Sequence, residues 1–442
     1  MQTFFFTTVG FWIVAAGAVV FYFAWFRRYV ERQTTIDAPR GFEPDAWPEA
    51  LVIMSLRGGD DSLHDTLDGL AAQNYPHYRL RLIIDNRDDE VNRVVRSWRR
   101  AHPRVPIQVE YLREPLRMCT LKCSSVHQVL SDEAARDPEL DRNGVVVLVD
   151  ADSDPYPNWL HDVVAPFAQR DVGGVTGNRW YFPRAGGVAA WCRFVFTAFS
   201  LPTMCRGGFS WGGTLALRRE IACSPAFLNA FARTPTEEQT CFEFLPKLGL
   251  RMHVAPQLIQ WNPDSIDFAG AETHLYRQSA WSRLFYPCWV PILAGIAALW
   301  CALIASLVWA GFALVDARPV FLLPLVLTAM FCATITSSLA RLHRTLQSHV
   351  FAPQGRELPT MNVARCVELL AATLGTLVVY TVALARAHVA DEIVWRGIVY
   401  RLFSDDTIAM TGYVPWTGAA KKPATAKTRA KVRAQTARAV RL

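Results

Sequence analysis

Three long runs without a charged residue restrict this chain more than any other feature of its sequence. They cover residues 1–26, 288–315 and 319–340. A helix needs about 20 consecutive apolar residues to cross the hydrocarbon core of a bilayer. The first run is therefore predicted to be a membrane anchor, and the other two are predicted to form a pair of spanning helices. The chain is expected to be a multi-pass membrane protein.

Arginine residues beside the first run predict how the anchor is oriented. Arg27, Arg28 and Arg32 follow the run, whereas a cleaved signal peptide would carry its positive charge in front. Because positive charge favours the cytosolic side, residues 1–33 are expected to stay uncleaved, with their C-terminal end in the cytosol. The domain that follows is then cytosolic, at the plasma or inner membrane if the source is bacterial.

The C-terminal part of the chain is predicted to return to the membrane. Residues 285–402 hold the helical pair and a third, shorter apolar run at 369–385, which has arginines on both flanks. That flanking charge favours an interfacial or re-entrant segment over a crossing. Residues 403–442 are predicted to be a disordered basic tail, since no acidic residue occurs from 407 onward. Such a tail is either simply solvated or attracted to anionic lipid headgroups, and nucleic acid is not expected as a partner.

Residues 40–284 show the pattern of an α/β domain. Short apolar runs typical of buried strands alternate with segments whose apolar residues recur at helical spacing. The predicted strands are residues 50–56, 80–85, 107–111 and 145–149, and the predicted helices are residues 62–72, 90–100 and 121–130. This alternation indicates a mostly parallel sheet covered by helices on both faces. Sheets of this kind bind ligands beyond the carboxyl ends of their strands.

Carboxylates follow the most apolar of these strands. Asp150, Asp152 and Asp154 come directly after residues 145–149. Carboxylates this close repel one another unless a cation offsets their charge, and oxygen ligands suit Mg²⁺ or Mn²⁺, with substrate phosphates completing the shell. The alternative is a polar turn that caps the next helix. Our hypothesis is a metal site at Asp150 and Asp152.

Three further residues are candidates for binding a nucleotide. Arg57 follows the first strand in an Arg-Gly-Gly turn, Asp85 ends the second strand, and Lys122 lies at a helix start. Arginine pairs with phosphate, and glycine lets the backbone approach a ligand closely. A carboxylate at a strand end can accept hydrogen bonds from a base or a ribose. The structural alternatives are an exposed arginine, an aspartate that opens a turn and a solvated lysine.

Two later segments carry the remaining candidates. Glu237 and Glu238 are adjacent acids behind a possible helix cap, Thr236. They are either first-turn acids favoured by the helix dipole, or one of them is a general base for an acceptor hydroxyl. Arg277 and Trp281 come shortly before the helical pair. They are either anchors at the membrane interface or groups that bind phosphate or lipid headgroups.

In their order along the chain, these features resemble the ceramide glucosyltransferase family over residues 51–402. The segment MSLRGGDDSL is similar to the family's K-P-L-K-G-x-D-x-x-L opening, and Asp150 and Asp152 match its D-x-D positions. The segment EIVWRGIVYRL resembles the family's W-R-x-x-x-Y-R-L. The resemblance implies a GT-A fold, which is an α/β nucleotide-diphospho-sugar transferase domain, with transmembrane helices before and after it.

The resemblance also implies roles for the candidate residues. Arg57, Asp85 and Lys122 fall on positions that place the nucleotide donor, and Glu238 falls beside Glu237 on the position of the catalytic base. Arg277 and Trp281 fall on a segment that the family places on the acceptor side.

The chain departs from the family pattern at three positions. Glu238 stands where the family has an aspartate, so the base has a longer side chain. Ala280 stands where the family has an arginine before Trp281. The first basic residue of the opening is replaced by Met54 or Ser55, depending on the alignment. These changes bear on the acceptor and on the rate.

The function implied is that of an inverting glycosyltransferase. It would move a hexose, glucose before others, from a UDP-sugar to a lipid hydroxyl such as that of ceramide, with Mg²⁺ or Mn²⁺. One alternative is a processive polysaccharide synthase, which the small number of firm spans after the domain disfavours. The other is a catalytically silent GT-A domain that serves as a membrane scaffold, which Glu238 and Ala280 favour.

Overall fold

The computed structural model describes residues 1–36, 41–59, 62–136, 144–286, 288–403 and 407–416. The chain divides into two compact units. We call the first the helical unit; it comprises Met1–Ala38, Arg179–Thr203 and Trp261–Val389. We call the second the sheet unit; it comprises Pro39–Asn178, Met204–Gln260 and Ala390–Leu442. The single domain expected over residues 40–284 therefore does not coincide with either unit.

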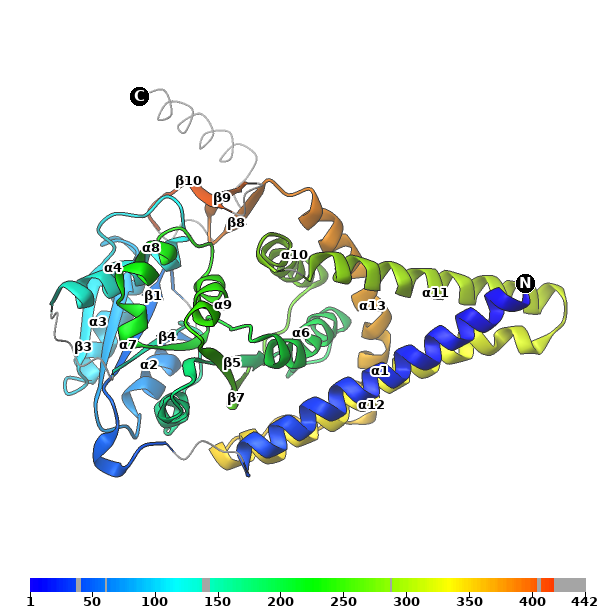
Figure 1. The fold of residues 1–442 in the computed structure, drawn as a ribbon, viewed down its shortest axis with the longest axis horizontal. Helices are drawn as coiled ribbons and strands as arrows, with labels where there is room; N and C mark the ends of the chain where they lie inside the picture. The colour runs from blue at the N-terminus through cyan, green and yellow to red at the C-terminus, as the bar shows by residue number, and fades with distance from the viewer. Residues whose placement is uncertain (37–40, 60–61, 137–143, 287, 404–406, 417–442) are drawn as a thin grey trace, which may run out of the picture. The chain divides into compact units, whose positions relative to one another are not determined.

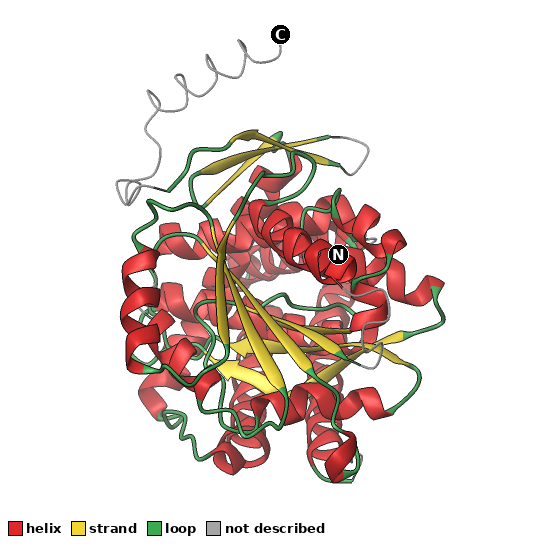
Figure 2. Cartoon of the chain, turned by 90° about the vertical axis from the view of Figure 1, so that its left-hand side faces the viewer, coloured by secondary structure: helices red, strands yellow, loops and turns green. Residues whose placement is uncertain are grey.

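The sheet unit is built on a seven-stranded sheet in the order β3-β2-β1-β4-β6-β5-β7. Figure 2 shows its strands in yellow, fanned by a pronounced twist. The strands are β1 (Ala50–Leu56), β2 (Tyr78–Ile84), β3 (Ile107–Tyr111), β4 (Val145–Val149), β5 (Val172–Trp180), β6 (Thr214–Arg218) and β7 (Arg251–Trp261). The first four strands are parallel to one another, whereas β6 runs antiparallel to both β4 and β5. The predicted mostly parallel α/β sheet is confirmed; the sequence analysis did not identify β5, β6 and β7.

Two apolar cores explain why β1 and β4 are continuous apolar runs. Val52 and Met54 face one core, and Leu51 and Ile53 face the other. Because neighbouring residues of a strand point to opposite faces, a sheet that is covered on both sides needs apolar residues at every position. The first core is closed by α2 (Leu63–Ala71), α3 (Val91–Ala101) and α5 (Trp159–Val164). The second core is closed by α4 (Leu121–Arg136), α8 (Pro225–Phe231) and α9 (Glu237–Lys247).

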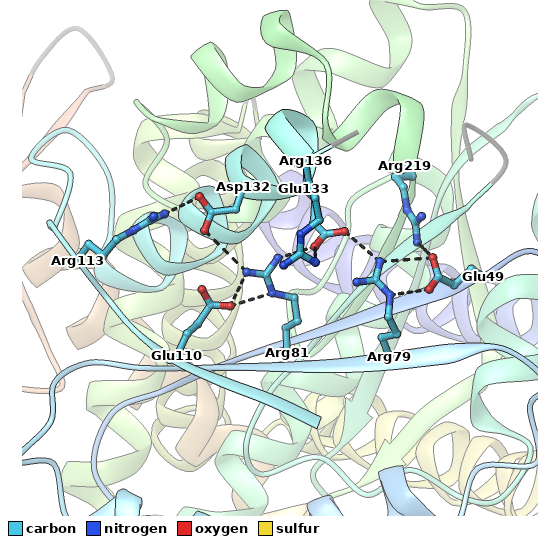
Figure 3. A network of polar contacts seen from close by, with 9 residues as sticks. All are labelled: Glu49, Arg79, Arg81, Glu110, Arg113, Asp132, Glu133, Arg136 and Arg219. Carbon is cyan, nitrogen blue, oxygen red and sulfur yellow. Dashed lines mark hydrogen bonds and ion pairs between the residues drawn. The ribbon is translucent and has the colours of Figure 1, made fainter. Parts of the chain in front are cut away.

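A network of charged side chains joins β2 to α4 (Figure 3). Nη1 of Arg81 lies 2.6 Å from Oε1 of Glu133, and Nη2 of Arg79 lies 3.0 Å from Oε2 of the same residue. The side chains of Arg81 and Glu133 are no more than 2% exposed. We call this set the Arg–Glu network; its members are Glu49, Arg79, Arg81, Glu110, Arg113, Asp132, Glu133, Arg136 and Arg219.

A second, three-stranded sheet follows near the C-terminal end of the described chain. It consists of β8 (Glu392–Trp395), β9 (Ile398–Leu402) and β10 (Ile408–Gly412), which pair antiparallel in the order β10-β9-β8. Arg396 and Gly397 have φ of 45° and 78°, so the turn between β8 and β9 has two residues in the left-handed region, as a tight hairpin requires. β10 lies within the stretch that we expected to be a tail, and residues 417–442 lie outside the described residues.

The six longest helices of the described residues lie wholly or mostly in the helical unit. They are α1 (Gln2–Thr34), α6 (Val188–Gly207), α10 (Phe268–Phe285), α11 (Trp289–Val315), α12 (Leu323–Leu346) and α13 (Val363–His388). Figure 1 shows α1, in blue, running beside α12, in yellow. Within the described residues, five helical segments are long and apolar enough to cross a membrane, namely Gln2–Thr34, Val188–Gly207, Trp289–Val315, Pro319–Gln354 and Val363–His388.

These five helices indicate a membrane protein. Each of the three uncharged runs forms such a helix, as predicted. Residues 369–385 lie in α13, whose length and composition suffice for a crossing, so their interfacial or re-entrant placement stays a prediction. The helix Val188–Gly207 was not identified as a membrane candidate from the sequence.

Candidate functional site

Four predicted site residues meet in the sheet unit. We call them the carboxylate cluster: Lys122, Asp150, Glu237 and Glu238. Lys122 is in the first turn of α4, Asp150 follows β4, and the two glutamates begin α9. Nζ of Lys122 donates to Oδ1 of Asp150 over 2.6 Å and forms an ion pair with Oε1 of Glu237. Elements that are far apart in the sequence thus place one ammonium group among three carboxylates.

The sheet order explains how these residues come together. β4 pairs with the antiparallel strand β6, and Val149 lies opposite Thr214. The backbone just before β6 is therefore beside the residues that follow β4, and the carbonyl of Gly212 accepts from Nζ of Lys122 over 3.2 Å. A Cβ atom on Gly212 would overlap the carboxylates of Glu237 and Glu238. A larger residue here would therefore push the two carboxylates out of their present positions.

Glu238 has one carboxylate oxygen engaged and the other buried. Its Oε1 accepts from the backbone N–H of Gly212 over 2.7 Å. Its Oε2 is buried and accepts no hydrogen bond from any described residue. Burial and the charge of Glu237 raise the pKa of Glu238 to about 7, although Lys122 and the bond from Gly212 act in the opposite direction. A buried acceptor with a pKa near neutrality can take a proton from a hydroxyl group.

The start of α9 holds both acids in position. Oγ1 of Thr236 accepts from the backbone N–H of Gln239 over 3.4 Å, so Thr236 caps the helix as the sequence suggested. Glu237 and Glu238 are therefore first-turn acids, which the helix dipole favours. They also belong to the carboxylate cluster, so the two interpretations of this pair do not exclude each other.

Lys122 is held strongly in its charged form. Burial by itself lowers the pKa of an ammonium group, but the charges of Asp150, Glu237 and Glu238 outweigh it and raise the pKa of Lys122 well above its usual value. The interpretation of Lys122 as a solvated lysine does not fit this geometry, because its side chain is only 17% exposed.

Asp150 and Asp152 fit a metal ion that takes part of its ligands from a substrate. Both are partly buried, whereas Asp154 is exposed. Among the described residues, no three His, Cys, Asp or Glu side chains gather as a complete ligand set. Mg²⁺ is typically bound by one or two carboxylates together with water and substrate phosphates. The donor chemistry agrees, because the cluster holds three carboxylates against one ammonium and a divalent ion would offset the excess.

Arg57 and Asp85 form a second polar centre in the same unit. Nη1 of Arg57 forms an ion pair with Oδ2 of Asp85, whose side chain is 1% exposed. Nε of Arg57 donates to the carbonyl of Arg396 over 3.1 Å, and Nη2 donates to the carbonyl of Val414 over 2.8 Å. Arg57 is therefore not a freely exposed arginine, since it joins the end of β1 to the end of β2 and to the C-terminal segment.

The residues that cover Asp85 were not predicted from the sequence. We call residues 413–416 the C-terminal strap. The hydroxyl of Tyr413 donates to Oδ1 of Asp85 over 2.7 Å, and the backbone N–H of Trp416 donates to Oδ2 over 3.1 Å. The signal was available, because Tyr413 and Trp416 are aromatic residues at the start of an otherwise basic and small-residue tail.

Arg277 and Trp281 lie one turn apart on α10, in the helical unit. Ala280 is fully buried and Trp281 is 8% exposed, so this face of α10 packs inside the protein. The two residues belong to a different unit from the carboxylate cluster, and their acceptor-side role stays a prediction.

Residues 10–408 match the family described as Glycosyl transferase family 21. No curated protein matches the chain. Similar solved structures include the mannosyltransferase PcManGT from Pyrobaculum calidifontis in complex with GDP-Man and Mn²⁺, at 16% identity, with 86% of this chain and 99% of that chain covered and a TM-score of 0.44. They also include S. aureus TarS 1-349, at 12% identity, with 83% and 100% covered and a TM-score of 0.29. A third is M. tuberculosis glucosyl-3-phosphoglycerate synthase, at 14% identity, with 52% and 77% covered and a TM-score of 0.30.

Proposed function

The chain belongs to glycosyltransferase family 21, the ceramide glucosyltransferase family, and on that premise we propose that it glycosylates a membrane lipid. The donor in this proposal is a UDP-sugar, with glucose as the hexose, and the acceptor is a lipid hydroxyl such as that of ceramide. The catalytic unit works at the cytosolic face, as the arginines after the anchor suggest. The observation that carries the proposal is Glu238, whose buried Oε2 lacks a donor among the described residues and whose pKa is raised to about 7.

Glu238 is the general base of the proposed reaction. Its carboxylate takes the proton of the acceptor hydroxyl while the acceptor oxygen forms a bond to the anomeric carbon. The bond between that carbon and the phosphate oxygen breaks, and UDP leaves. Because the acceptor attacks opposite the leaving group in a single displacement, the anomeric configuration inverts. A base whose pKa lies near the working pH combines the ionised state with sufficient basicity.

The remaining residues bind and orient the donor. Asp150 and Asp152 would hold Mg²⁺ or Mn²⁺ against the diphosphate, and the ion, when bound, would offset the charge that builds on the leaving group. Lys122 fixes Asp150 through the bond of 2.6 Å and forms an ion pair with Glu237 beside it. Arg57 and Asp85 place the nucleotide at the ends of β1 and β2, where α/β sheets bind ligands.

Arg277 and Trp281 are proposed to contact the acceptor. Trp281 is mostly buried, so its ring would support the acceptor site from within the protein, and Arg277 would offer positive charge one helical turn away. Ala280 leaves this segment without the arginine of the family pattern. The substitution bears on which acceptor is used.

Two other functions remain to be compared with this one. A processive polysaccharide synthase was disfavoured because few spans were expected after the domain, but α13 adds a further candidate helix, so the number of spans no longer separates the two. A catalytically silent scaffold is favoured by Glu238 and Ala280, which depart from the family pattern. The product decides between the three functions: one lipid, a growing polymer, or none.

The first experiment measures transfer of labelled sugar from UDP-glucose into lipid that is extracted by organic solvent. Membranes that contain the full chain receive ceramide and Mn²⁺, and Asp152→Ala is the matched control. One discrete labelled lipid that is absent in the control supports the proposal, and the anomeric configuration of that product tests inversion. Label that grows into a polymer with time points to the synthase. Absence of label from UDP-glucose and from a panel of other sugar nucleotides points to the silent scaffold.

A further inference from the structure

The C-terminal strap engages both oxygens of the carboxylate that is proposed to bind the nucleotide. Oδ1 of Asp85 accepts from the hydroxyl of Tyr413 over 2.7 Å. Oδ2 accepts from the backbone N–H of Trp416 over 3.1 Å and from Nδ2 of Asn86 over 3.3 Å, and it also pairs with Arg57. A carboxylate offers about four lone-pair positions, two on each oxygen. Three donors already meet Oδ2 and one meets Oδ1, so a ligand that needs both oxygens of Asp85 has to displace donors of the strap.

The groups on Asp85 have the chemistry of a nucleoside. One is the backbone N–H of Trp416, a residue that also carries a planar aromatic ring, and the other is the hydroxyl of Tyr413. A pyrimidine base presents an N–H and a ribose presents hydroxyls, which are the donors that a strand-end carboxylate accepts. The indole ring of Trp416 also covers Gly58, where an added Cβ would come within 2.7 Å of it. The ring therefore lies on the backbone turn that a bound nucleotide would have to approach.

Several bonds within the sheet unit hold the strap in this position. The guanidinium carbon of Arg57 lies 5.8 Å from the ring centre of Tyr413 and 5.5 Å from that of Trp416. Nε1 of Trp416 donates to Oε1 of Glu90 over 3.4 Å, and the backbone carbonyl of Trp416 accepts from Nδ2 of Asn86 over 3.2 Å. Arg57 thus has two aromatic rings near its guanidinium group, where a phosphate ligand would need its positive charge.

The β8–β9 hairpin connects the strap to the same arginine. Arg396 has φ of 45°, a left-handed conformation that is unfavourable for a residue with a side chain. It is held by two reciprocal bonds, from Nη1 of Arg396 to the carbonyl of Arg57 over 2.9 Å and from Nε of Arg57 to the carbonyl of Arg396 over 3.1 Å. The hairpin therefore stays attached to the end of β1 through its own bonds, independently of residues 413–416.

We infer that the C-terminal strap is an intramolecular competitor of the nucleotide. Residues 413–416 occupy the nucleoside subsite at Asp85 and Gly58, and they withdraw when a uridine nucleotide binds there. The inference rests on the proposed function only in assuming that Arg57 and Asp85 bind the nucleotide of the donor. The strap then sets the fraction of molecules whose nucleoside subsite is free. The apparent affinity for the donor is the intrinsic affinity reduced by that fraction.

The test is the affinity of the purified full chain for UDP in the presence of Mn²⁺, measured by isothermal titration calorimetry. Tyr413→Phe removes only the hydroxyl on Asp85, and Trp416→Ala removes the ring over Gly58. Each should tighten UDP binding about tenfold, because the closed state loses a bond to a carboxylate or a ring contact while the open state loses nothing. Val394→Ala is the matched control, since Val394 is an exposed residue of β8 in the same small sheet. Weaker binding in the strap variants would make the strap a wall of the pocket and overturn the inference, as would an unchanged affinity.

Hydrogen exchange measures the withdrawal itself. The amide hydrogen of Trp416, which is bonded to Asp85, should exchange faster when the unmodified chain is saturated with UDP. Slower exchange under UDP would again overturn the inference. Failure of the proposed function looks different: the strap would still withdraw and the variants would still bind UDP more tightly, but no lipid would be labelled. If neither the variants nor the unmodified chain bind UDP, the inference is wrong. Labelling of lipid from another sugar nucleotide in that case would still support a lipid glycosyltransferase.

Discussion

The Arg–Glu network and the carboxylate cluster are two polar clusters of the same sheet unit, and they balance charge in opposite ways. The network has five arginines against four acids, and its central pair, Arg81 and Glu133, is buried and fully bonded. The cluster has one lysine against three acids, and Oε2 of Glu238 accepts no hydrogen bond from a described residue. We therefore expect the buried, paired centre of the network to serve the fold, and the larger acidic excess of the cluster to be offset by a cation or substrate that binds there.

Glu133 in the network and Glu238 in the cluster have pKa values that are shifted in opposite directions. Burial alone would raise the pKa of Glu133, but the bonds and charges of Arg79 and Arg81 lower it overall. In Glu238, burial and the charge of Glu237 outweigh Lys122, and the pKa is raised to about 7. The comparison therefore predicts that changes in the cluster alter transfer with little loss of stability, and that changes in the network do the reverse.

The largest effect is expected for Glu238→Gln. The amide keeps the shape of the side chain but cannot take a proton, so kcat for lipid glycosylation should fall by about 10²–10⁴-fold, the usual contribution of a general base. The temperature of unfolding should stay the same or rise, because one buried negative charge is removed from an acidic cluster. Kinetics and thermal unfolding are measured on the same detergent-solubilised preparation. A large loss of stability would show that Glu238 stabilises the fold, and the two clusters would then not differ in the way proposed.

The next effect is expected for Glu133→Ala. The change leaves Arg81 buried with fewer acceptors, and removal of one partner of a buried pair destabilises by about 3–5 kcal/mol. Because Glu110 still contacts Arg81 with a distance of 2.5 Å, the lower end of that range is expected. The measurement is denaturant unfolding, with activity per folded molecule as the second readout. Unchanged stability together with lost transfer would show that the network, too, serves the reaction.

The sequence predicted the carboxylate cluster better than it predicted the Arg–Glu network, and the reason is physical. Asp150 stands at the carboxyl end of a parallel strand, where such sheets bind ligands, and Glu238 is one of two adjacent acids at a helix start. Their meeting depends on the antiparallel strand β6, which places the backbone of residues 212–213 beside both. Arg81 and Glu133 lie in the middle of a strand and a helix, where nothing local distinguishes a buried ion pair from an exposed charge. Their pairing follows from how α4 packs on β2, which is a tertiary contact.

The same reasoning separates what was predicted of the fold from what was missed. The parallel strands β1 to β4 were predicted because each is a short apolar run next to an amphipathic helix. β6 and the strap were missed because their partners are remote: β6 pairs with β4 in the opposite direction, and Tyr413 reaches back to Asp85. Hydropathy identified α1, α11 and α12 as membrane candidates but not α6, and it carries no information about which helices pack together.

The carboxylate cluster and the Arg–Glu network should also differ in their response to pH. Glu238 must be ionised to act as a base, and its pKa is raised to about 7, so kcat should fall about tenfold for each pH unit below 7. The raised pKa also makes stability depend on pH. The folded protein holds the proton of Glu238 more tightly than the unfolded chain, whose pKa is the usual 4.5, so the free energy of unfolding decreases as the pH rises from about 4.5 to 7. Glu133 has a lowered pKa, so its contribution is present above 4.5 and is lost only as the pH falls further.

Between pH 5.5 and 8 the chain should therefore lose activity on acidification without losing the Arg–Glu network. A pH–rate profile and a pH series of unfolding temperatures test this together. Lys122→Gln provides a check, because Lys122 lowers the pKa of Glu238 and its removal should move the acid limb of kcat to higher pH. If the acid limb of kcat lies at the same pH in the variant, a group other than Glu238 is responsible for that limb.

The smallest effect is expected at the edge of the Arg–Glu network. Arg113 pairs with Asp132 over 2.6 Å, but its side chain is 64% exposed, in contrast to 2% for Arg81. Water and salt screen an exposed pair, so Arg113→Ala should lower the free energy of unfolding by less than about 1 kcal/mol, and less again at high salt. Denaturant unfolding at two salt concentrations, beside Glu133→Ala, measures this. A loss in Arg113→Ala as large as in Glu133→Ala would mean that the network acts as one unit, and burial would then not separate its centre from its edge.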